Sequence, residues 1–427
     1  MTLTDPGEIR ARFKHWQTRV LFSTIIGYAI FYFVRKNLSV AMPVMAQTLH
    51  LNKSVLGTFL TLHGLVYGVS KFGHGFVGDR ANARALMVTG IVGSAVLNLF
   101  FGMSSTAVAF GVIWMLNGYF QGMGFPPCAR LTTHWFSPRE LASKMSIWNT
   151  SHCIGGGLIV ILCGYLVTAS WRFCFFVPAA IALLCAYYLS RALPDTPPSV
   201  GLPEVEGTQG ESGEQTSAQF RALLLKRVFG NKYVWLISVS NFFVYTIRYA
   251  VFDWGPTLLT ETKHYRITHA GWMMAGFECA GAVGALLAGW MTDRFFGGRA
   301  MRVAVVAMTL AGVSLGLFWK VPRQTEWEST LLLCATGFFI YCPQCLVAIA
   351  VANLATKRAA ATAIGLTSIF GYASTVLSGW GLGALVDRAG WDAGFEGLLV
   401  VAGIGVAVFA AAWPAKVHGY GEADATA

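Results

Sequence analysis

Two stretches of the chain repeat one arrangement of a tyrosine, an arginine and a proline. YFVRKNLSVAMP at 32–43 and YTIRYAVFDWGP at 245–256 share the same spacing, and Arg35 and Arg248 are 213 positions apart. Both arginines lie inside long apolar runs, where an ionised guanidinium costs about 2.5 to 3.5 kcal/mol even on lenient membrane-insertion scales. Each is therefore expected to face a cavity or a partner. Because a guanidinium donates paired hydrogen bonds to phosphoryl oxygens, one buried arginine in each half of a duplicated chain predicts an anion site that both halves contact.

The composition indicates a membrane protein. Of the 427 residues, 55% are hydrophobic and only 12% are charged, and the mean hydropathy is +0.56, which is unlike a soluble domain. Apolar runs of about 20 residues are long enough to span a bilayer as helices. They occur in two sets of six, roughly at 18–40, 55–78, 83–104, 107–128, 142–168, 172–192, 233–258, 270–291, 300–320, 329–351, 361–385 and 390–413. We therefore expect an all-α membrane protein with twelve transmembrane helices in two pseudo-symmetric halves.

A polar segment divides the chain. PDTPPSVGLPEVEGTQGESGEQTSAQ is acidic and rich in Pro, Gly and Ser, as linkers are. The predicted organisation is an N-terminal six-helix half at 1–193, a cytoplasmic linker at 194–232 and a C-terminal six-helix half with a short cytoplasmic tail at 233–427. Of the 31 Lys and Arg residues, 20 lie on the face that holds both termini and this linker, 7 on the opposite face and 4 within spans. The positive-inside rule therefore places both termini in the cytoplasm.

Several other sites and functions are disfavoured. The net charge of +11 does not indicate nucleic-acid binding, because topology already explains basic residues in short loops and tails. The first twenty residues lack the short apolar core and cleavage site of a removable signal peptide. Cys342 and Cys345 have redox spacing but lie in a predicted membrane helix, so packed thiols are expected there. The sequence contains no Walker-type phosphate loop, and we expect neither a metal nor a cofactor.

A second repeated signature follows the second span of each half. GFVGDR at 75–80 and GWMTDRFFGGR at 289–299 carry aspartates that are 214 positions apart. An acid at a helix end with basic residues beyond it can pair with a neighbouring helix in one conformation and release it in another. A charged turn without a switching role is the alternative. The residues that we assign to these cytoplasmic gating loops are Asp79, Arg80, Arg84, Asp293, Arg294 and Arg299.

These motifs together resemble the major facilitator superfamily, and within it the organophosphate:phosphate antiporters. Members of that family exchange glycerol 3-phosphate, hexose phosphates or phosphoglycerates for inorganic phosphate. The resemblance covers nearly the whole chain through YFVRKNLSVAMP, YGVSKFGHGFVGDR, GYFQGMGFPPCARLTTHWFS, WNTSHCIGGG, NKYVWLISVSNFFVYTIRYAVFDWGP and GWMTDRFFGGR. It implies a secondary antiporter of the bacterial inner membrane rather than an enzyme, working by alternating access. We expect it to act as a monomer.

The resemblance also assigns residues to the substrate site. Arg35 and Arg248 match the family's phosphate-binding arginines. His152 in WNTSH matches its substrate histidine, a residue type that can change charge near neutral pH. Lys71 matches a lysine that adds positive charge to the lumen, although a lysine there could also snorkel to the interface. The other candidates for substrate contact are Asn149, one helical turn before His152, and the aromatics Tyr28, Tyr32, Tyr67, Tyr245, Tyr341 and Tyr372. Phenols can hydrogen-bond sugar or glycerol hydroxyls, with helix packing as the alternative role.

Lys36 needs a partner of its own. On a continuous helix it would point roughly 100° away from Arg35, so the two could not share one ligand contact. Asp253 and Glu278 are the acids available within the spans of the other half, and both match family acids. We therefore expect an inter-half ion pair that is made and broken during the transport cycle.

Two other functions fit the same fold. A membrane sensor of a sugar phosphate would need the same arginines. Proton-coupled sugar symport would need a carboxylate in the first or fourth span, and neither predicted span contains one. The substrate signals conflict, because FGY at 370–372 and RYAVFDWGP look like glycerol-3-phosphate members while YCPQ at 341–344 looks like hexose-phosphate or phosphoglycerate members. Glycerol 3-phosphate is favoured.

Overall fold

The computed structural model describes residues 6–78, 81–205, 217–296, 299–320, 325–355 and 359–415. These residues form helices and no strand. The first nine α-helices are α1 (Pro6–Phe33), α2 (Asn37–Leu49), α3 (Lys53–Gly78), α4 (Ala83–Met103), α5 (Ala107–Gln121), α6 (Phe125–Trp135), α7 (Pro138–Asn149), α8 (Ser151–Ala169) and α9 (Phe173–Ala192). The others are α10 (Ser217–Leu224), α11 (Lys232–Thr262), α12 (Ile267–Phe296), α13 (Ala300–Lys320), α14 (Glu326–Ala355), α15 (Ala360–Ala373) and α16 (Leu382–Ala411). A short 3-10 helix, η1 (Pro197–Val200), and two short π-helices, η2 (Leu225–Phe229) and η3 (Val376–Gly381), accompany them.

The twelve predicted spans are confirmed, with breaks that hydropathy did not indicate. Among the described residues, ten helical stretches are long and apolar enough to cross a membrane. One of them, Thr362–Ala411, covers the last two predicted spans, which separate at Gly390, where φ is 78°. The predicted span 107–128 is divided between α5 and α6, so neither part is long enough by itself. The first span is likewise broken, between α1 and α2.

Two compact units arise from the packing of the described residues. Unit 1 comprises Met1–Ala41 and Val66–Ser212, and unit 2 comprises Met42–Leu65 and Gly213–Ala427. Helix α3 therefore contributes its first half to unit 2 and its second half to unit 1. The boundaries that the sequence predicted for the two halves and the linker stay a prediction.

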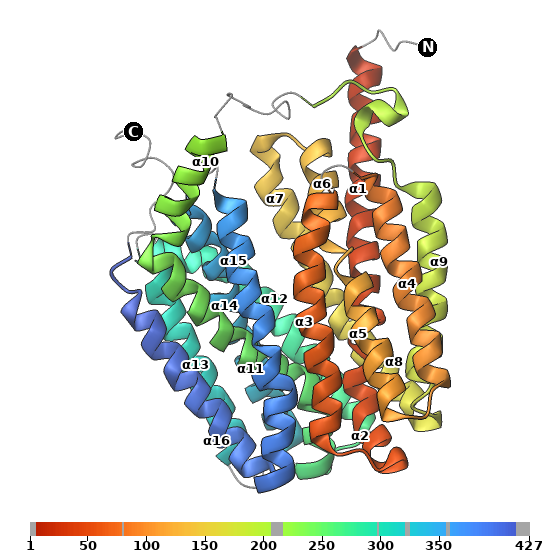
Figure 1. The fold of residues 1–427 in the computed structure, drawn as a ribbon, viewed down its shortest axis with the longest axis vertical. Coiled ribbons are helices and arrows are strands. Elements are labelled where there is room, and N and C mark those ends of the chain that lie inside the picture. The colour runs from red at the N-terminus through yellow and green to blue at the C-terminus, as the bar shows by residue number, and fades with distance from the viewer. Residues whose placement is uncertain are drawn as a thin grey trace. The chain divides into compact units, whose positions relative to one another are not determined.

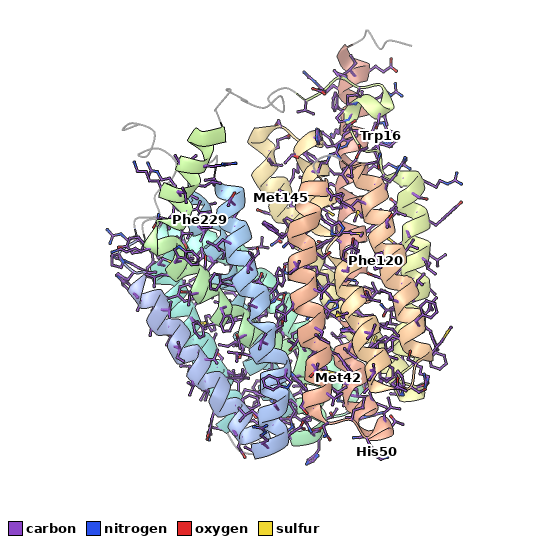
Figure 2. The ribbon with its side chains drawn as sticks, in the orientation of Figure 1. Trp16, Met42, His50, Phe120, Met145 and Phe229 are labelled. Atoms are coloured by element: carbon purple, nitrogen blue, oxygen red, sulfur yellow. The ribbon has the colours of Figure 1, made fainter. Side chains whose placement is uncertain are left out.

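Unit 1 is built from closely packed apolar helices. Helix α4 lies against α5 and α9, and α1 lies against α8 and α9 (Figure 1). The approach of α4 to α5 depends on small residues, because a side chain at Gly93 would occupy the space of the Phe120 ring, which is labelled on α5 in Figure 2. Glycine at such contacts lets membrane helices approach closely where the hydrophobic effect between helices is weak.

Unit 2 is centred on α11 and α14. Helix α14 lies against α12 and α13, while α11 contacts α14, α15 and α16 (Figure 1). The start of α3 is held in this unit by Asp387 of α16, which accepts hydrogen bonds from the backbone N–H groups of Lys53 at 3.0 Å and Ser54 at 2.7 Å. Lys53 Nζ also lies 3.1 Å from Glu261 Oε2 on α11. The first N–H groups of a helix have no partner within it, so Asp387 replaces a local cap.

Candidate functional site

The first predicted arginine lies at a break between two helices. Helix α1 ends at Phe33 and α2 begins at Asn37, so Arg35 lies in the interval between them. The backbone N–H groups of Arg35 and Lys36 both donate to the Tyr32 carbonyl, at 3.3 and 2.9 Å. The prediction of one continuous helix over 18–40 was wrong here, because α1 ends before Arg35 and α2 begins after Lys36.

Two tyrosines surround the Arg35 guanidinium in unit 1. Its Cζ atom lies 4.0 Å from the centre of the Tyr32 ring and 4.9 Å from that of Tyr67, on α3. A cation this close to aromatic faces is stabilised by the ring quadrupoles, more strongly where water is scarce. Both tyrosines are buried, at 8% and 4% exposure. The two rings therefore help to stabilise the Arg35 guanidinium in an apolar interior.

His152 belongs to the same cluster. Its ring lies 6.0 Å from that of Tyr32, and only 7% of the residue is exposed. The Nδ1 atom contacts the carbonyl of Asn149, and Nε2 lies 3.3 Å from Cys153 Sγ. The predicted shared helical face of Asn149 and His152 is interrupted, because α7 ends at Asn149 and α8 begins at Ser151. The side chain of Asn149 is exposed, so its carbonyl makes the contact to His152.

Lys71 and Tyr28 join the cluster through aromatic rings. Tyr28 lies 5.8 Å from Tyr32 and 4.7 Å from Trp148, between ring centres. The Trp148 ring lies 5.6 Å from Phe125, and Lys71 Nζ lies 4.2 Å from the centre of that phenylalanine ring. Sequence reasoning did not single out Phe125, although it lies in the quoted motif GYFQGMGFPPCAR.

The second predicted arginine is in unit 2, on the uninterrupted helix α11. Arg248 is 5% exposed, and its Nη2 atom lies 3.9 Å from Glu278 Oε1 on α12. The same carboxylate oxygen accepts a hydrogen bond of 2.5 Å from the Tyr341 hydroxyl of α14. The Tyr341 ring centre also lies 4.4 Å from Arg248 Cζ. Three helices thus bring a cation, an acid and a phenol together in an apolar interior.

Other tyrosines complete this second cluster. The ring centres of Tyr245 and Tyr249 lie 5.9 and 5.8 Å from Arg248 Cζ, and the rings of Tyr245 and Tyr372 lie 6.1 Å apart. Tyr249 was not among the sequence candidates, although it follows Arg248 directly. All the predicted substrate tyrosines therefore lie in one or other arginine cluster.

One of the two acids predicted as a partner for Lys36 contacts another cation. Glu278 contacts Arg248 inside unit 2, which sequence reasoning missed because it considered Glu278 only as one of two possible partners of Lys36. Asp253 is 7% exposed on α11, and Lys36 is 7% exposed in unit 1. The pairing of Lys36 with Asp253 or Glu278 stays a prediction.

The proposed gating loops are described only in part. Asp79 and Arg80 lie outside the described residues, as does the side chain of Asp293. The described basic residues Arg84, Arg294 and Arg299 are exposed, so the gating role of these loops stays a prediction.

The start of α4 has a contact that sequence reasoning missed. Asp195, placed in the predicted linker, accepts a hydrogen bond from Ala83 N at 2.7 Å and lies 3.4 Å from Arg130 Nη2. Arg130 also donates to the Ala81 carbonyl. Asp195 and Arg130 therefore connect the segment after α9 and helix α6 to the start of α4.

Both clusters contain residue types that suit an oxyanion. A buried guanidinium is the residue type best suited to a phosphoryl or carboxylate group, and the nearby phenols can donate further hydrogen bonds. No cluster of three or more potential metal ligands is found within the described ranges. The Cys342 thiol donates to the Gly284 carbonyl at 3.2 Å, in keeping with the packed role expected for it.

The relation of the chain to known proteins follows from the whole sequence. The sequence profile of the Major Facilitator Superfamily matches residues 24–379, with a second match over 256–424. The chain belongs to the Major Facilitator Superfamily. The fold agrees, because a bacterial homologue of the human lysosomal transporter Spinster, solved in an inward-facing and unoccupied conformation, superposes with a TM-score of 0.74 at 15% identity, covering 94% of this chain and 96% of that one.

Three superfamily relatives match nearly the full length of both chains. A probable hexose phosphate transport protein of Chlamydia muridarum is 37% identical over 97% of this chain and 94% of its own. The glycerol-3-phosphate transporter of Bacillus subtilis is 35% identical over 96% and 95%. The membrane sensor protein UhpC of Escherichia coli is 35% identical over 94% and 93%. The resemblance stated from the motifs is confirmed, and this superfamily member is an integral membrane protein rather than an enzyme.

Proposed function

We propose that this superfamily member is a secondary antiporter that exchanges an organic phosphate for inorganic phosphate. The observation that carries the proposal is the repeated arginine. Arg35 and Arg248 occupy equivalent positions of an internal repeat, and each lies among tyrosines in its own unit. A phosphoryl group offers enough oxygens for two guanidinium groups at once. The names of the relatives support an organic phosphate as substrate.

Exchange follows from the charge of the site. Arg35 and Lys71 bring two positive charges to the cluster of unit 1, and positive charge where water is scarce is costly to leave without an anion. A carrier that changes conformation readily only with an anion bound would exchange one phosphate for another instead of releasing it to an empty site. We expect rocking of the two six-helix halves to re-expose the site on the other side of the membrane.

The substrate and the location complete the proposal. Glycerol 3-phosphate is favoured by FGY and RYAVFDWGP, with hexose phosphates and phosphoglycerates as alternatives. We place the protein in the bacterial inner membrane as a monomer. Both termini lie in the cytoplasm in this proposal, because basic residues are in excess on the face that holds them.

Counterflow in proteoliposomes tests the exchange. Purified protein is reconstituted into vesicles loaded with inorganic phosphate, and uptake of labelled phosphate is measured. Glycerol 3-phosphate, glucose 6-phosphate and 3-phosphoglycerate are then added outside in turn. We expect one of them to compete with labelled phosphate and to exchange for it. Vesicles without protein provide the control for leak, and uptake equal to that control with every phosphate would contradict the proposal.

A membrane sensor of a sugar phosphate is the second candidate, because the relative UhpC of Escherichia coli is named as a sensor and matches 94% of this chain. A sensor needs to bind its ligand but not to transport it. Binding of glucose 6-phosphate to the purified protein without any counterflow would favour the sensor.

A further inference from the structure

Three buried asparagines surround the helix break that holds Arg35. Asn98 of α4 donates through Nδ2 to the Val34 carbonyl at 2.9 Å and accepts through Oδ1 from Asn37 Nδ2 at 2.7 Å. Asn117 of α5 donates to the same Val34 carbonyl, also at 2.9 Å. Val34 and Asn37 are the residues on either side of Arg35 and Lys36. The Asn98 side chain therefore bridges the break from one edge to the other.

The network is completed by backbone carbonyls. Asn98 Nδ2 also donates to the Ser94 carbonyl at 2.8 Å, and Asn37 Nδ2 donates to the Cys174 carbonyl at 2.8 Å. Asn37, Asn98 and Asn117 are all 0% exposed. An amide in an apolar interior is costly unless it is hydrogen-bonded, and a carbonyl at a helix end loses its partner in the next turn. The asparagines therefore stabilise a break that the apolar surroundings would otherwise disfavour.

The equivalent arginine in unit 2 has no such break. Helix α11 runs as one helix from Lys232 to Thr262, so the backbone hydrogen bonds of the helix itself hold Arg248 in place. The buried Asn241 of this helix donates instead to the Thr367 carbonyl at 3.0 Å. The backbone at the two arginines of the repeat is thus held by different means: side chains of α4 and α5 bond the backbone beside Arg35, while Arg248 lies within a continuous helix.

We propose that Asn98, together with Asn37 and Asn117, positions the Arg35 guanidinium for phosphate. We call these three side chains the asparagine clasp. The proposal rests on the proposed function, since it assumes that Arg35 binds phosphate. The clasp makes no contact with the ligand itself and acts by fixing the backbone from which Arg35 extends. Because paired hydrogen bonds to phosphate require a defined guanidinium orientation, loosening the break weakens binding while the charge is unchanged.

Asn117→Leu is the gentler test variant, because the Val34 carbonyl keeps its bond from Asn98. Asn98→Asp is the second variant, since a carboxyl group keeps an acceptor for Asn37 and offers at most one donor, when protonated, in place of the two amide N–H groups. The matched control is Gln121→Met. Gln121 is a buried amide on the same helix α5, 1% exposed, but it donates to Ser94 Oγ at 3.2 Å instead of to the break.

The first measurement is hydrogen–deuterium exchange of the full chain in detergent without ligand. The Lys36 amide, bonded to the Tyr32 carbonyl at 2.9 Å, reports on the break. We expect peptides that cover residues 33–38 to exchange several-fold faster in Asn117→Leu and Asn98→Asp than in the wild type, and at the wild-type rate in Gln121→Met. Unchanged exchange in both test variants would overturn the clasp.

The second measurement is the affinity for inorganic phosphate, determined by calorimetry. Each variant is measured at a temperature equally far below its own midpoint of thermal unfolding. We expect Asn117→Leu to weaken binding by about three- to tenfold, the effect of one buried hydrogen bond, with Gln121→Met unchanged. Faster exchange at 33–38 with wild-type phosphate affinity would overturn the positioning role. If the wild-type chain bound no phosphate, the proposed function would fail by itself. Hydrogen–deuterium exchange at residues 33–38 would still decide whether the clasp holds the break.

Discussion

Arg248 Nη2 lies 3.9 Å from Glu278 Oε1, and both residues are almost completely buried. The carboxylate shares its oxygen with the Tyr341 hydroxyl at 2.5 Å. An arginine that is to bind phosphate thus has an anion beside it before any substrate arrives. If Arg248 binds phosphate, the substrate has to compete with Glu278 for the same guanidinium.

Glu278→Gln is therefore expected to bind inorganic phosphate more tightly than the wild type. The neutral amide no longer competes for Arg248, and the buried guanidinium gains more from an external anion once its internal one is removed. Calorimetry on purified protein measures the change, for which we expect at least a few-fold lower Kd. Glu261→Gln serves as the control, because Glu261 contacts Lys53 at 3.1 Å and not Arg248. A weaker or unchanged phosphate affinity in Glu278→Gln would argue against the competition.

Arg35→Lys and Arg248→Lys should each nearly abolish phosphate exchange although the positive charge is retained. An ammonium group cannot reproduce the two parallel hydrogen bonds of a guanidinium. Counterflow of labelled phosphate in proteoliposomes measures the loss. Arg172→Lys is the control, since Arg172 donates to the Ser104 carbonyl at 2.9 Å, away from both clusters. Wild-type phosphate affinity in either purified test variant would falsify the role of that arginine.

Lys36 should be coupled to one of two acids. If it pairs with Asp253 or Glu278, neutralising one partner leaves an uncompensated buried charge, at a cost of about 3 to 5 kcal/mol. Lys36→Met and the neutral variant of its true partner, Asp253→Asn or Glu278→Gln, should then transport poorly, and removing both charges of that pair should restore part of the rate. Double-mutant cycles on transport rate and phosphate affinity measure this coupling. Additive losses in both cycles would exclude both acids as partners.

Asp387→Ala should destabilise the start of α3. Its carboxylate accepts the backbone N–H groups of Lys53 and Ser54, and loss of such a cap costs about 0.5 to 2 kcal/mol. We expect a lower midpoint of thermal unfolding in detergent. Asp392→Ala is the matched control, because this carboxylate also lies on α16 but accepts from Trp319 Nε1 at 2.9 Å. Equal losses of stability in the two variants would show that capping is not the cause.

Much of the architecture could be predicted from composition and repetition. Apolar runs of membrane-spanning length indicate helices because no other open structure satisfies its backbone polar groups in lipid. The repeat of Arg35 at Arg248 pointed to both clusters, since a charge inside an apolar run is too costly to lie there without a purpose. Membership of the superfamily confirmed the interpretation of the motifs.

Local helix breaks could not be predicted from hydropathy. Val34 and Asn37 flank a break at Arg35 and Lys36 in a run that is otherwise mostly apolar. The mean hydropathy over a window of about 20 residues, the length of one span, does not resolve a break this short. Its cause lies in Asn98 and Asn117, which are distant in the sequence and reach the Val34 carbonyl only after α4 and α5 have packed.

The sequence by itself determined which residue types lie within the membrane spans, and that the arginine motif occurs once in each half of the chain. Tertiary structure alone decided their partners. Glu278 could have been assigned to any cation in a span, and its position 3.9 Å from Arg248 follows from how α12 and α14 pack beside α11. Asp387 caps a helix that begins 334 residues earlier. Hydrogen bonds and ion pairs act over a few ångströms, so contacts between distant segments depend on the packing of whole helices and leave no periodic signal in the sequence.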